Sequence, residues 1–328
     1  MKLRHWSITN GSGLHGVAQS LVEAETKAGH DSALVDSMVE SPAWEDAIDA
    51  DVQIVHSHLP NGIQQKITKA KLRTVWIGHG TPDHVFQSSV EFAQSGGYGH
   101  PEPLMLMFHW LQHASARVTF WPRHQWIYSR MVDRGTVIDC IPLGVDRSFW
   151  CPGESRGKFA GTPSVFTAEN PHYIKWPYDL FTLWPDVAEA VDGAMAKLHA
   201  IYVPRDMHSC VYPWTYRNGC SYSAFLSPMV FDKDGLRNAF RSTDYTIGLV
   251  RYGDFNQLSA QANAAGSTTI SYRGNEYADY WITEGDQRTM RDELIAILDG
   301  TTPKRAKTPV PDISETAANM QRVYERIL

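Results

Sequence analysis

The sequence predicts an α/β protein built from two doubly wound, Rossmann-like domains that face each other across a cleft. Two observations lead to this prediction. Short β-rich runs alternate with helical stretches along almost all of the 328 residues, and strands separated by helices form parallel sheets with right-handed crossovers. The alternation stops once, near the middle of the chain, and then restarts, which indicates two domains.

The first domain, expected over residues 1–150, contains six segments rich in β-branched and aromatic residues, which we interpret as strands. They are LRHWSIT (3–9), ALVD (33–36), DVQIVHSH (51–58), RTVWIGHG (73–80), RVTFWP (117–122) and DCIPLG (139–144). Helices are expected at residues 14–27 and 103–114, where apolar residues recur at helical spacing.

The second domain, expected over residues 151–310, follows a linker rich in Gly, Pro, Ser and charge, CPGESRGKFAGTPS (151–164). Its expected strands are SVFTAEN (164–170), LHAIYVP (198–204), YSAFLS (222–227), YTIGLV (245–250) and TTISYR (268–273). Helices are expected at 179–191, 233–241, 257–265 and 287–298. A last helix at 314–328, within a segment 311–328, either packs back on the first domain or caps the second.

The composition is that of a globular protein, with 43% hydrophobic and 20% charged residues. The formal net charge of −6 argues against a protein that mainly coats a polyanion. Four cysteines without CxxC spacing favour reduced thiols. The start MKLRHWSITN has no apolar signal core, and no apolar run is long enough to span a bilayer. We therefore expect a cytoplasmic location and no transmembrane segment.

A small-residue turn, Gly11-Ser12-Gly13, lies between the first strand and the first helix. Small residues let backbone amides approach a phosphate closely, and the positive end of the following helix adds to the attraction. The spacing matches neither the dinucleotide-binding fingerprint nor a P-loop. The turn either contacts a ligand or simply reverses the chain.

Three histidines stand at expected strand ends. His56 and His58 alternate, so both project to one face of a strand, and His79 closes the next strand before a glycine turn. Three imidazoles could bind a metal, but no acidic ligand at helical spacing accompanies them, and we expect no metal site. His56 is expected to be a structural histidine and His79 to contact a substrate.

The string IPLGVDRSFWCPG (141–153) resembles the NGVD…F.P segment of GT-B glycosyltransferases, especially the family-four-like retaining enzymes. Other pieces of the sequence resemble the family in the same order along almost the whole chain. They are the glycine loop and first helix GSGLHGVAQSLVEAETKAGHD, the strand ends VHSH and IGHG, the segment TAENPHYIKWPYDLF, and the donor-binding region LRNAFRSTDYTIGLVRYGDFNQLSAQANAAGSTTISYRGNEYADYWI.

The resemblance implies roles for single residues. Lys175 matches the lysine of a basic pair that grips the donor diphosphate, whereas Ala168 stands at the place of the arginine, and Arg205 is the candidate to compensate. The family also uses two glutamates eight positions apart. The second falls on Gln261, which can still bond hydroxyls, and the first on Gly253, next to Asp254.

The implied activity is a retaining, metal-independent transfer of a sugar from a nucleotide-diphosphate sugar, with no cofactor. Lys175, His79 and Asp254 are the expected catalytic residues. The donor-binding residues are expected to be Gly11, Ser12, Gly13, Arg205, Asn256, Gln257 and Gln261. In such enzymes the leaving phosphate helps to deprotonate the acceptor, so no strong protein base is needed.

Alternatives stay open at this point. A sugar-nucleotide epimerase of GT-B architecture would need acid/base carboxylates in the cleft, and few carboxylates lie near Asp254. A two-lobed binding protein is a third reading. The acceptor could be a glycan, a lipid-linked sugar, a protein or a modified DNA base. The string WPRHQWIYSR (121–130) combines aromatic and basic residues that could stack on a nucleic acid.

Overall fold

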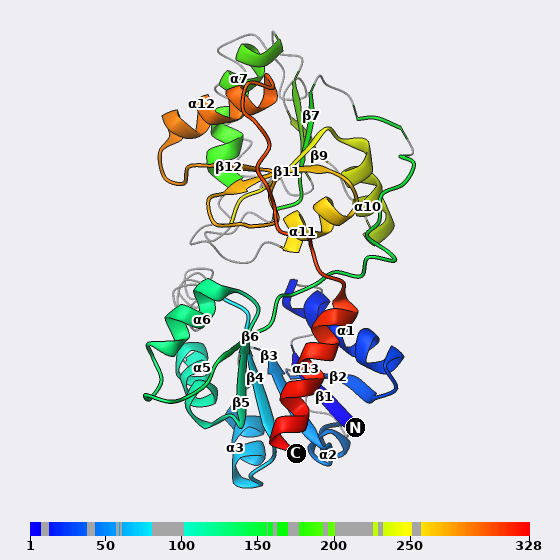
Figure 1. The fold of residues 1–328 in the computed structure, drawn as a ribbon, viewed down its shortest axis with the longest axis vertical. Coiled ribbons are helices and arrows are strands. Elements are labelled where there is room, and N and C mark those ends of the chain that lie inside the picture. The colour runs from blue at the N-terminus through cyan, green and yellow to red at the C-terminus, as the bar shows by residue number, and fades with distance from the viewer. Residues whose placement is uncertain are drawn as a thin grey trace. The chain divides into compact units, whose positions relative to one another are not determined.

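The fold was analysed in a computed structural model that describes residues 1–7, 13–37, 43–56, 59, 61–80, 102–155, 157–159, 163–169, 177–192, 196–200, 226–228, 232–250 and 257–328. The chain divides into two compact units. The first unit is Met1–Asp146 together with Pro311–Leu328, and the second unit is Arg147–Val310. Each unit holds one six-stranded parallel sheet with helices on it (Figure 1). The predicted fold class, two doubly wound α/β domains, is confirmed.

The sheet of the first unit has the order β2-β1-β3-β4-β5-β6. Its strands are β1 (Lys2–Ser7), β2 (Asp31–Asp36), β3 (Val52–His56), β4 (Thr74–Gly78), β5 (Ala116–Thr119) and β6 (Asp139–Cys140). The helices of this unit are α1 (Gly13–Lys27), α2 (Ala43–Ile48), α3 (Asn61–Lys69), α5 (Glu102–His113), α6 (Pro122–Ser129) and α13 (Ile313–Ile327). The order reverses between β1 and β3, and ligands of doubly wound sheets bind beyond the carboxyl ends at such a switch point.

The two faces of this sheet differ in chemistry because successive side chains of a strand point to opposite sides. Trp6, Val55 and Trp76 occupy paired positions on one face and pack in a hydrophobic cluster with buried residues of α2, α3, α5 and α6. The opposite face carries His5 and His56 and lies under α1, beside which α13 runs (Figure 1). Polar groups are thus buried on the α1 face.

The last helix belongs to the first unit. Asp312 caps α13 in a capping box with Glu315, an arrangement that satisfies the first amides of a helix. Just before this cap, the returning chain pairs with the segment after β6. The Val145 amide donates to the Pro311 carbonyl at 3.1 Å, and the Ile313 amide donates to the Val145 carbonyl at 3.0 Å. The GVD string of the sequence is therefore the place where the returning chain attaches.

The sheet of the second unit has the order β12-β11-β10-β7-β8-β9. Its strands are β7 (Ser164–Thr167), β8 (Lys197–Ala200), β9 (Leu226–Pro228), β10 (Tyr245–Gly248), β11 (Thr268–Tyr272) and β12 (Tyr280–Ile282). The helices are α7 (Pro177–Asp192), α10 (Lys233–Ser242), α11 (Gln257–Ala264) and α12 (Gln287–Leu298). Here the order reverses between β7 and β10, as in the classical dinucleotide-binding arrangement.

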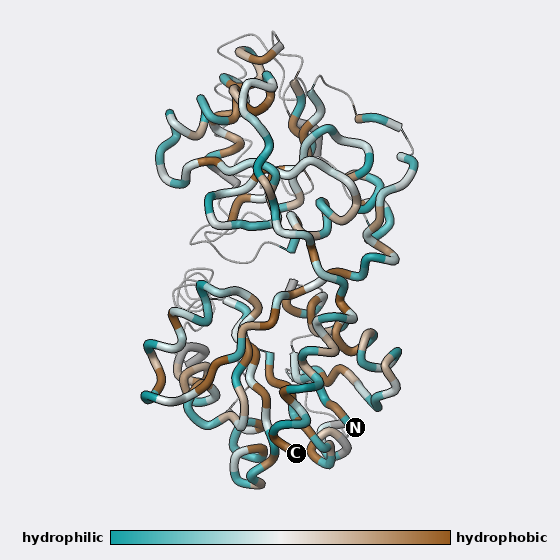
Figure 2. Tube along the Cα trace, in the orientation of Figure 1, coloured by the Kyte–Doolittle hydropathy of each residue, from teal (hydrophilic) through white to brown (hydrophobic). Residues whose placement is uncertain are grey.

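The central strands of both units are rich in apolar residues (Figure 2), as expected for parallel sheets covered on both faces. Among the elements of the described residues, sequence analysis did not predict β12 and the helices α2, α3 and α6. The strand β12 has three residues, too few for an alternating pattern. In α6 the basic and aromatic residues surround the helix without an apolar stripe, and Trp126 is 59% exposed.

Candidate functional site

His79 lies at the carboxyl end of β4, the position at which parallel sheets present ligand-binding groups. Its side chain is half-buried. The Nε2 atom of His79 is 2.7 Å from the Nδ1 atom of His56, and the two rings stack with centroids 5.0 Å apart. The ring of Phe120, just beyond β5, meets His79 edge-on at 5.4 Å between centroids. The orientation of the imidazole is therefore set from two sides.

The backbone on either side of His79 is also braced. Gly78 lies against the rings of Trp76 and Tyr128, and a Cβ atom there would come within 2.7 Å of Trp76 and 3.0 Å of Tyr128. The buried hydroxyl of Tyr128 donates a hydrogen bond to the Gly80 carbonyl. Gly78 thus lets the strand end pack closely on α6, which holds His79 in place.

The interaction of His79 continues into the protein as a chain of buried polar groups. His56 Nε2 lies 3.0 Å from His5 Nδ1, and His5 Nε2 lies 2.7 Å from Glu25 Oε2. Glu25, on α1, also accepts hydrogen bonds from Ser32 Oγ at 2.7 Å and from the Tyr324 hydroxyl at 2.7 Å. This histidine chain, Glu25–His5–His56–His79, links α1, β1, β3 and the end of β4.

Burial determines the charge of these groups. His5, Glu25 and His56 are each at most 1% exposed. Burial, followed by the neighbouring rings of His79 and His5, brings the pKa of His56 well below its ordinary value, so this ring is neutral. Burial alone would raise the pKa of Glu25, but the charge of His5 and the hydrogen bonds from His5, Ser32 and Tyr324 outweigh it and lower the pKa.

In the second unit, α11 begins at Gln257 beyond the end of β10, at the switch point of the sheet. Gln257 and Gln261 are half-buried and one helical turn apart, so they share a face of α11. The buried Ser259, Ala260 and Ala262 let this helix lie close to the sheet. Its first turn contains no acidic side chain, which leaves the positive end of the helix available to an anion.

The first unit offers a similar helix start. Gly13 is the first residue of α1, whose first turn likewise contains no acidic side chain. Six of the site residues named from the sequence lie outside the described residues: Gly11, Ser12, Lys175, Arg205, Asp254 and Asn256. His58 lies outside them as well.

Within the described ranges, no group of three or more His, Cys, Asp or Glu side chains is arranged to hold a metal ion. His56 and His79, considered as metal ligands from the sequence, instead bind each other. Over the same ranges no helix combines the length and the apolar character that crossing a membrane requires.

Sequence reasoning missed His5 and Glu25. Both are buried, and 20 residues separate them. The available signal was a histidine and a glutamate inside otherwise apolar patterns of a strand and a helix, since charged residues are rarely buried without partners. Another buried carboxylate, Glu169, is 1% exposed and follows β7 in the second unit.

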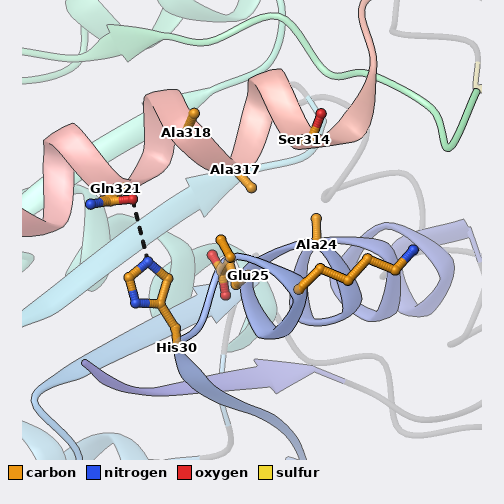
Figure 3. Close-up of a pocket in the computed structure, with 9 residues that line it drawn as sticks. Ala24, Glu25, His30, Ser314, Ala317, Ala318 and Gln321 are labelled. Atoms are coloured by element: carbon orange, nitrogen blue, oxygen red, sulfur yellow. Dashed lines mark hydrogen bonds between the residues drawn. The ribbon is translucent and has the colours of Figure 1, made fainter.

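A shallow hollow of about 240 Å³ between α1 and α13 lies away from the strand ends (Figure 3). Small side chains such as Ala24 and Ala317 line it, and His30 reaches across to Gln321 at 3.4 Å. The carboxylate of Glu25 borders it but is already bound by three donors. We assign no ligand to this hollow.

No protein-family model matches the chain, and no curated protein matches its sequence. Solved structures do match. Sucrose-phosphate synthase from Thermosynechococcus elongatus has a TM-score of 0.70 at 12% identity, with 99% of this chain and 98% of that chain covered. HepE of Anabaena in complex with UDP-glucose has a TM-score of 0.67 at 11% identity, with 99% and 100% covered.

An alpha-glucosyltransferase in complex with UDP-glucose and DNA containing an abasic site has a TM-score of 0.58 at 9% identity, with 99% of this chain and 94% of that chain covered. The fold is GT-B. The resemblance drawn from the sequence is confirmed at the level of the fold. In this GT-B chain the histidine chain ends at the carboxyl end of β4 in the first sheet, and α11 begins beyond the carboxyl end of β10, at the switch point of the second sheet.

Proposed function

We propose that the protein is a glycosyltransferase that moves a sugar from a nucleoside-diphosphate sugar to an acceptor. The observation that carries this proposal is the end-to-end GT-B likeness, since 98 to 100% of sucrose-phosphate synthase and HepE is covered by nearly the whole of this chain. Two of the similar structures are complexes with UDP-glucose. Both supply a donor of the proposed class.

The donor diphosphate carries the charge that the protein must stabilise. When the bond between sugar and diphosphate breaks, negative charge develops on the leaving group, and helix amino termini and cations stabilise it. The start of α11 at Gln257 and the start of α1 at Gly13 present amides without a competing acidic side chain. We assign Lys175 to the diphosphate, with Arg205 in place of the arginine that the family has.

The remaining contacts to the donor substrate are assigned from the chemistry of its hydroxyl and phosphate groups. Gln261 is assigned to the ribose hydroxyls, to which an amide can both donate and accept. Asp254 is assigned to the donor sugar, and Asn256 and the Gly11-Ser12 turn to the phosphates. His79 holds a sugar hydroxyl from the first unit. We further propose that transfer retains the anomeric configuration and needs no divalent metal, because cations and helix termini take over the stabilising role.

A reducing, cytoplasmic location fits this function. Within the described residues, Cys140 and Cys151 form no disulfide, and cysteines kept as thiols are typical of proteins in reducing compartments.

One feature of the first unit favours a modified DNA base as acceptor. On α6, Trp126 is 59% exposed, and the guanidinium of Arg130 lies 4.2 Å from the centre of its ring. Arg123 is exposed and three residues before Trp126, so the three side chains share one face of the helix. An exposed aromatic flanked by arginines is suited to stacking on a base beside a phosphate backbone.

The test is a thermal-shift and turnover assay on the full chain with several nucleotide sugars, run with and without EDTA. Stabilisation by UDP or another nucleoside diphosphate, and release of that diphosphate when an acceptor is added, are the expected results. Interconversion of the free sugar nucleotide without an acceptor would instead indicate an epimerase. DNA with and without hydroxymethylated bases, compared with simple glycans, identifies the acceptor class.

A further inference from the structure

We propose that the outer side of α3, α5 and α6 docks a strand of DNA, with lysines and arginines on the phosphates and Trp126 against an unpaired base. This surface holds the polymer over several nucleotides, in addition to the one base that Trp126 meets. The link to sugar transfer rests on the function proposed above, whereas binding of the strand does not.

Two stretches of the first unit contain no acidic side chain. Residues 52–82 and residues 103–132 lack aspartate and glutamate altogether, although the whole chain has 36 of these residues against 30 lysines and arginines. The negative net charge of the chain therefore coexists with a locally positive region. Its exposed cations, which we call the basic helical face, are Lys66, Lys69, Lys71, Arg73, Arg123 and Arg130.

The two stretches fold into three neighbouring helices on one side of the first sheet (Figure 1). Buried residues of α3, α5 and α6 share one hydrophobic cluster. Thr68 Oγ1 of α3 lies 3.1 Å from His109 Nε2 of α5. The Tyr128 hydroxyl of α6 lies 3.5 Å from Met107 Sδ of α5. Because packed helices have axes about 8–10 Å apart, the surface from α3 to α6 is about 20 Å wide.

The carboxylates near the α3 end of this surface are bound elsewhere. Asp51 accepts a hydrogen bond from the backbone amide of Lys2 at 2.7 Å, and Asp49 pairs with Lys2 Nζ at 3.7 Å. Both precede β3, at the same end of the sheet as Arg73, whose carbonyl accepts from the Gln53 amide. The positive charge after α3 is therefore not offset by these two acids.

At the other end of the surface, an exposed aromatic stands among cations. Trp126 is 59% exposed, and the guanidinium of Arg130 lies 4.2 Å from the centre of its ring. Arg123 precedes it by one helical turn and is also exposed. Proteins that hold single-stranded nucleic acid combine a cationic track for the backbone with aromatic rings on which bases stack. The basic helical face has both parts.

The chemistry of the surface fits a nucleic acid better than a membrane. Helices that lie on a bilayer present large apolar residues to it. Here Ile63 and Ile67 of α3 are at most 1% exposed, and the aromatic and basic residues of α6 form no apolar stripe. A DNA strand carries one phosphate per about 3.4 Å, so about six nucleotides match a surface of this width.

The first experiment measures binding of a fluorescein-labelled single-stranded DNA to the full chain by anisotropy, over a range of salt and without any nucleotide sugar. The triple variant Lys69→Glu, Lys71→Glu and Arg73→Glu should bind at least about tenfold more weakly than the wild type. Each lost phosphate contact removes about 0.7 from the slope of log K against log salt for a single strand, so the slope should fall by about two.

The matched control reverses three exposed cations outside the surface, Lys27→Glu, Lys158→Glu and Arg288→Glu. It changes the net charge equally and should bind the strand as the wild type does. Equal weakening in both triple variants would show that only the net charge matters and would overturn the proposal. So would the absence of strand binding by the wild type at low salt, or a preference of the wild type for phosphatidylserine vesicles over the strand.

The second experiment tests the base contact. Trp126→Ala should weaken binding and leave the salt slope unchanged, because stacking releases no counterions. Trp126→Phe should restore most of the affinity, since a smaller ring still stacks. Unchanged affinity of Trp126→Ala at every salt concentration contradicts the docking of a base on this ring. Circular dichroism of both variants checks that the helices are intact.

The last measurement connects the surface to sugar transfer. With a hydroxymethylated DNA strand as acceptor, the triple variant of the basic helical face should raise the KM for the strand, and the control triple variant should not. An unchanged KM contradicts the role of the surface in holding the acceptor. Failure of UDP to stabilise the wild type contradicts only the proposed function, because strand binding is measured without a donor.

Discussion

The backbone amide of Gly144 donates a hydrogen bond to the Thr316 hydroxyl at 2.8 Å, across 172 residues of sequence. The same hydroxyl donates to the Pro142 carbonyl at 2.9 Å. Thr316 is fully buried. The buried Thr316 hydroxyl therefore joins the first turn of α13 to the segment after β6, where it bonds the backbone on either side of Leu143.

Gly144→Ala should destabilise the first unit. A Cβ atom at this position would lie 2.5 Å from the carbonyl carbon of Asp312 and 2.7 Å from the carbonyl oxygen of Pro311. Both are backbone atoms, which cannot turn away, so we expect a loss of about 1–3 kcal/mol, measured by urea unfolding. Gly62→Ala is the matched control, because nothing lies within 4 Å of its Cβ position in α3. An unchanged midpoint for Gly144→Ala would contradict the attachment described here.

Tyr324→Phe should lower stability by about 1–3 kcal/mol, since it leaves a buried carboxylate oxygen of Glu25 without its donor. The pKa of Tyr324 is raised well above its ordinary value by burial and then by Glu25, so the hydroxyl stays protonated and donates at all working pH values. The control is Tyr245→Phe, whose hydroxyl makes a long 3.5 Å bond to the Ile297 carbonyl. Thermal unfolding should separate the two variants, and equal losses would refute a special role for Tyr324.

The stability of the protein should fall as the pH drops below about 6.5, the ordinary value of a histidine. Burial holds the pKa of His56 well below that value in the folded state. The unfolded chain therefore binds a proton that folded His56 rejects, and the free energy of unfolding decreases with acid by up to about 1.4 kcal/mol per pH unit.

Glu25 acts in a lower window. Its pKa is depressed in the folded protein, so its contribution to stability is present above the ordinary carboxyl pKa. That contribution is lost only as the pH falls through the lowered pKa of the folded state.

The prediction for His56 is checked by urea midpoints of the wild type and of His56→Asn, measured from pH 8 to pH 5. The midpoint should depend less steeply on pH in the variant. Equal pH dependence of the midpoint in both proteins would show that His56 does not cause the loss of stability in acid.

His79→Ala should reduce kcat/KM for sugar transfer by about 100-fold or more, the usual contribution of a positioned proton donor or acceptor. Stabilisation by UDP should persist, because the diphosphate is assigned to other groups. His113→Ala, at the exposed end of α5, serves as the control and should retain full activity. Steady-state kinetics with the donor varied decides the outcome, and unchanged kcat/KM in His79→Ala would remove this residue from the site.

Lys175→Met should lower kcat by about 100- to 1000-fold, as expected when a group that stabilises developing charge is removed. It should also weaken stabilisation by UDP, since the cation is assigned to the diphosphate. Lys158→Met, at an exposed position of the second unit, is the matched change. If transfer by Lys175→Met equals that of the control, the assignment of the leaving-group cation is wrong.

Much of the fold was predictable because its signals are local. Each strand named from the sequence contains or overlaps a strand of the structure, from LRHWSIT over β1 to TTISYR over β11. Apolar, β-branched runs that alternate with helical segments form a parallel sheet covered by helices, because few other arrangements bury both faces of the strands. The elements that were not predicted were either short, as β12 is, or lacked an apolar stripe, as α6 does. The position of His79 at a strand end was predictable for the same local reason.

By itself, the sequence determined the two doubly wound sheets, the attachment of a helix to nearly every strand, and a histidine at the carboxyl end of a strand. Only the tertiary structure decided which buried groups are linked to that histidine by hydrogen bonds. His5, Glu25 and Tyr324 come from positions up to 319 residues apart, and no periodicity relates them. Their pairing follows from strand order and helix packing, which place buried donors beside the acceptors they need, and such long-range pairing leaves no local trace in a chain.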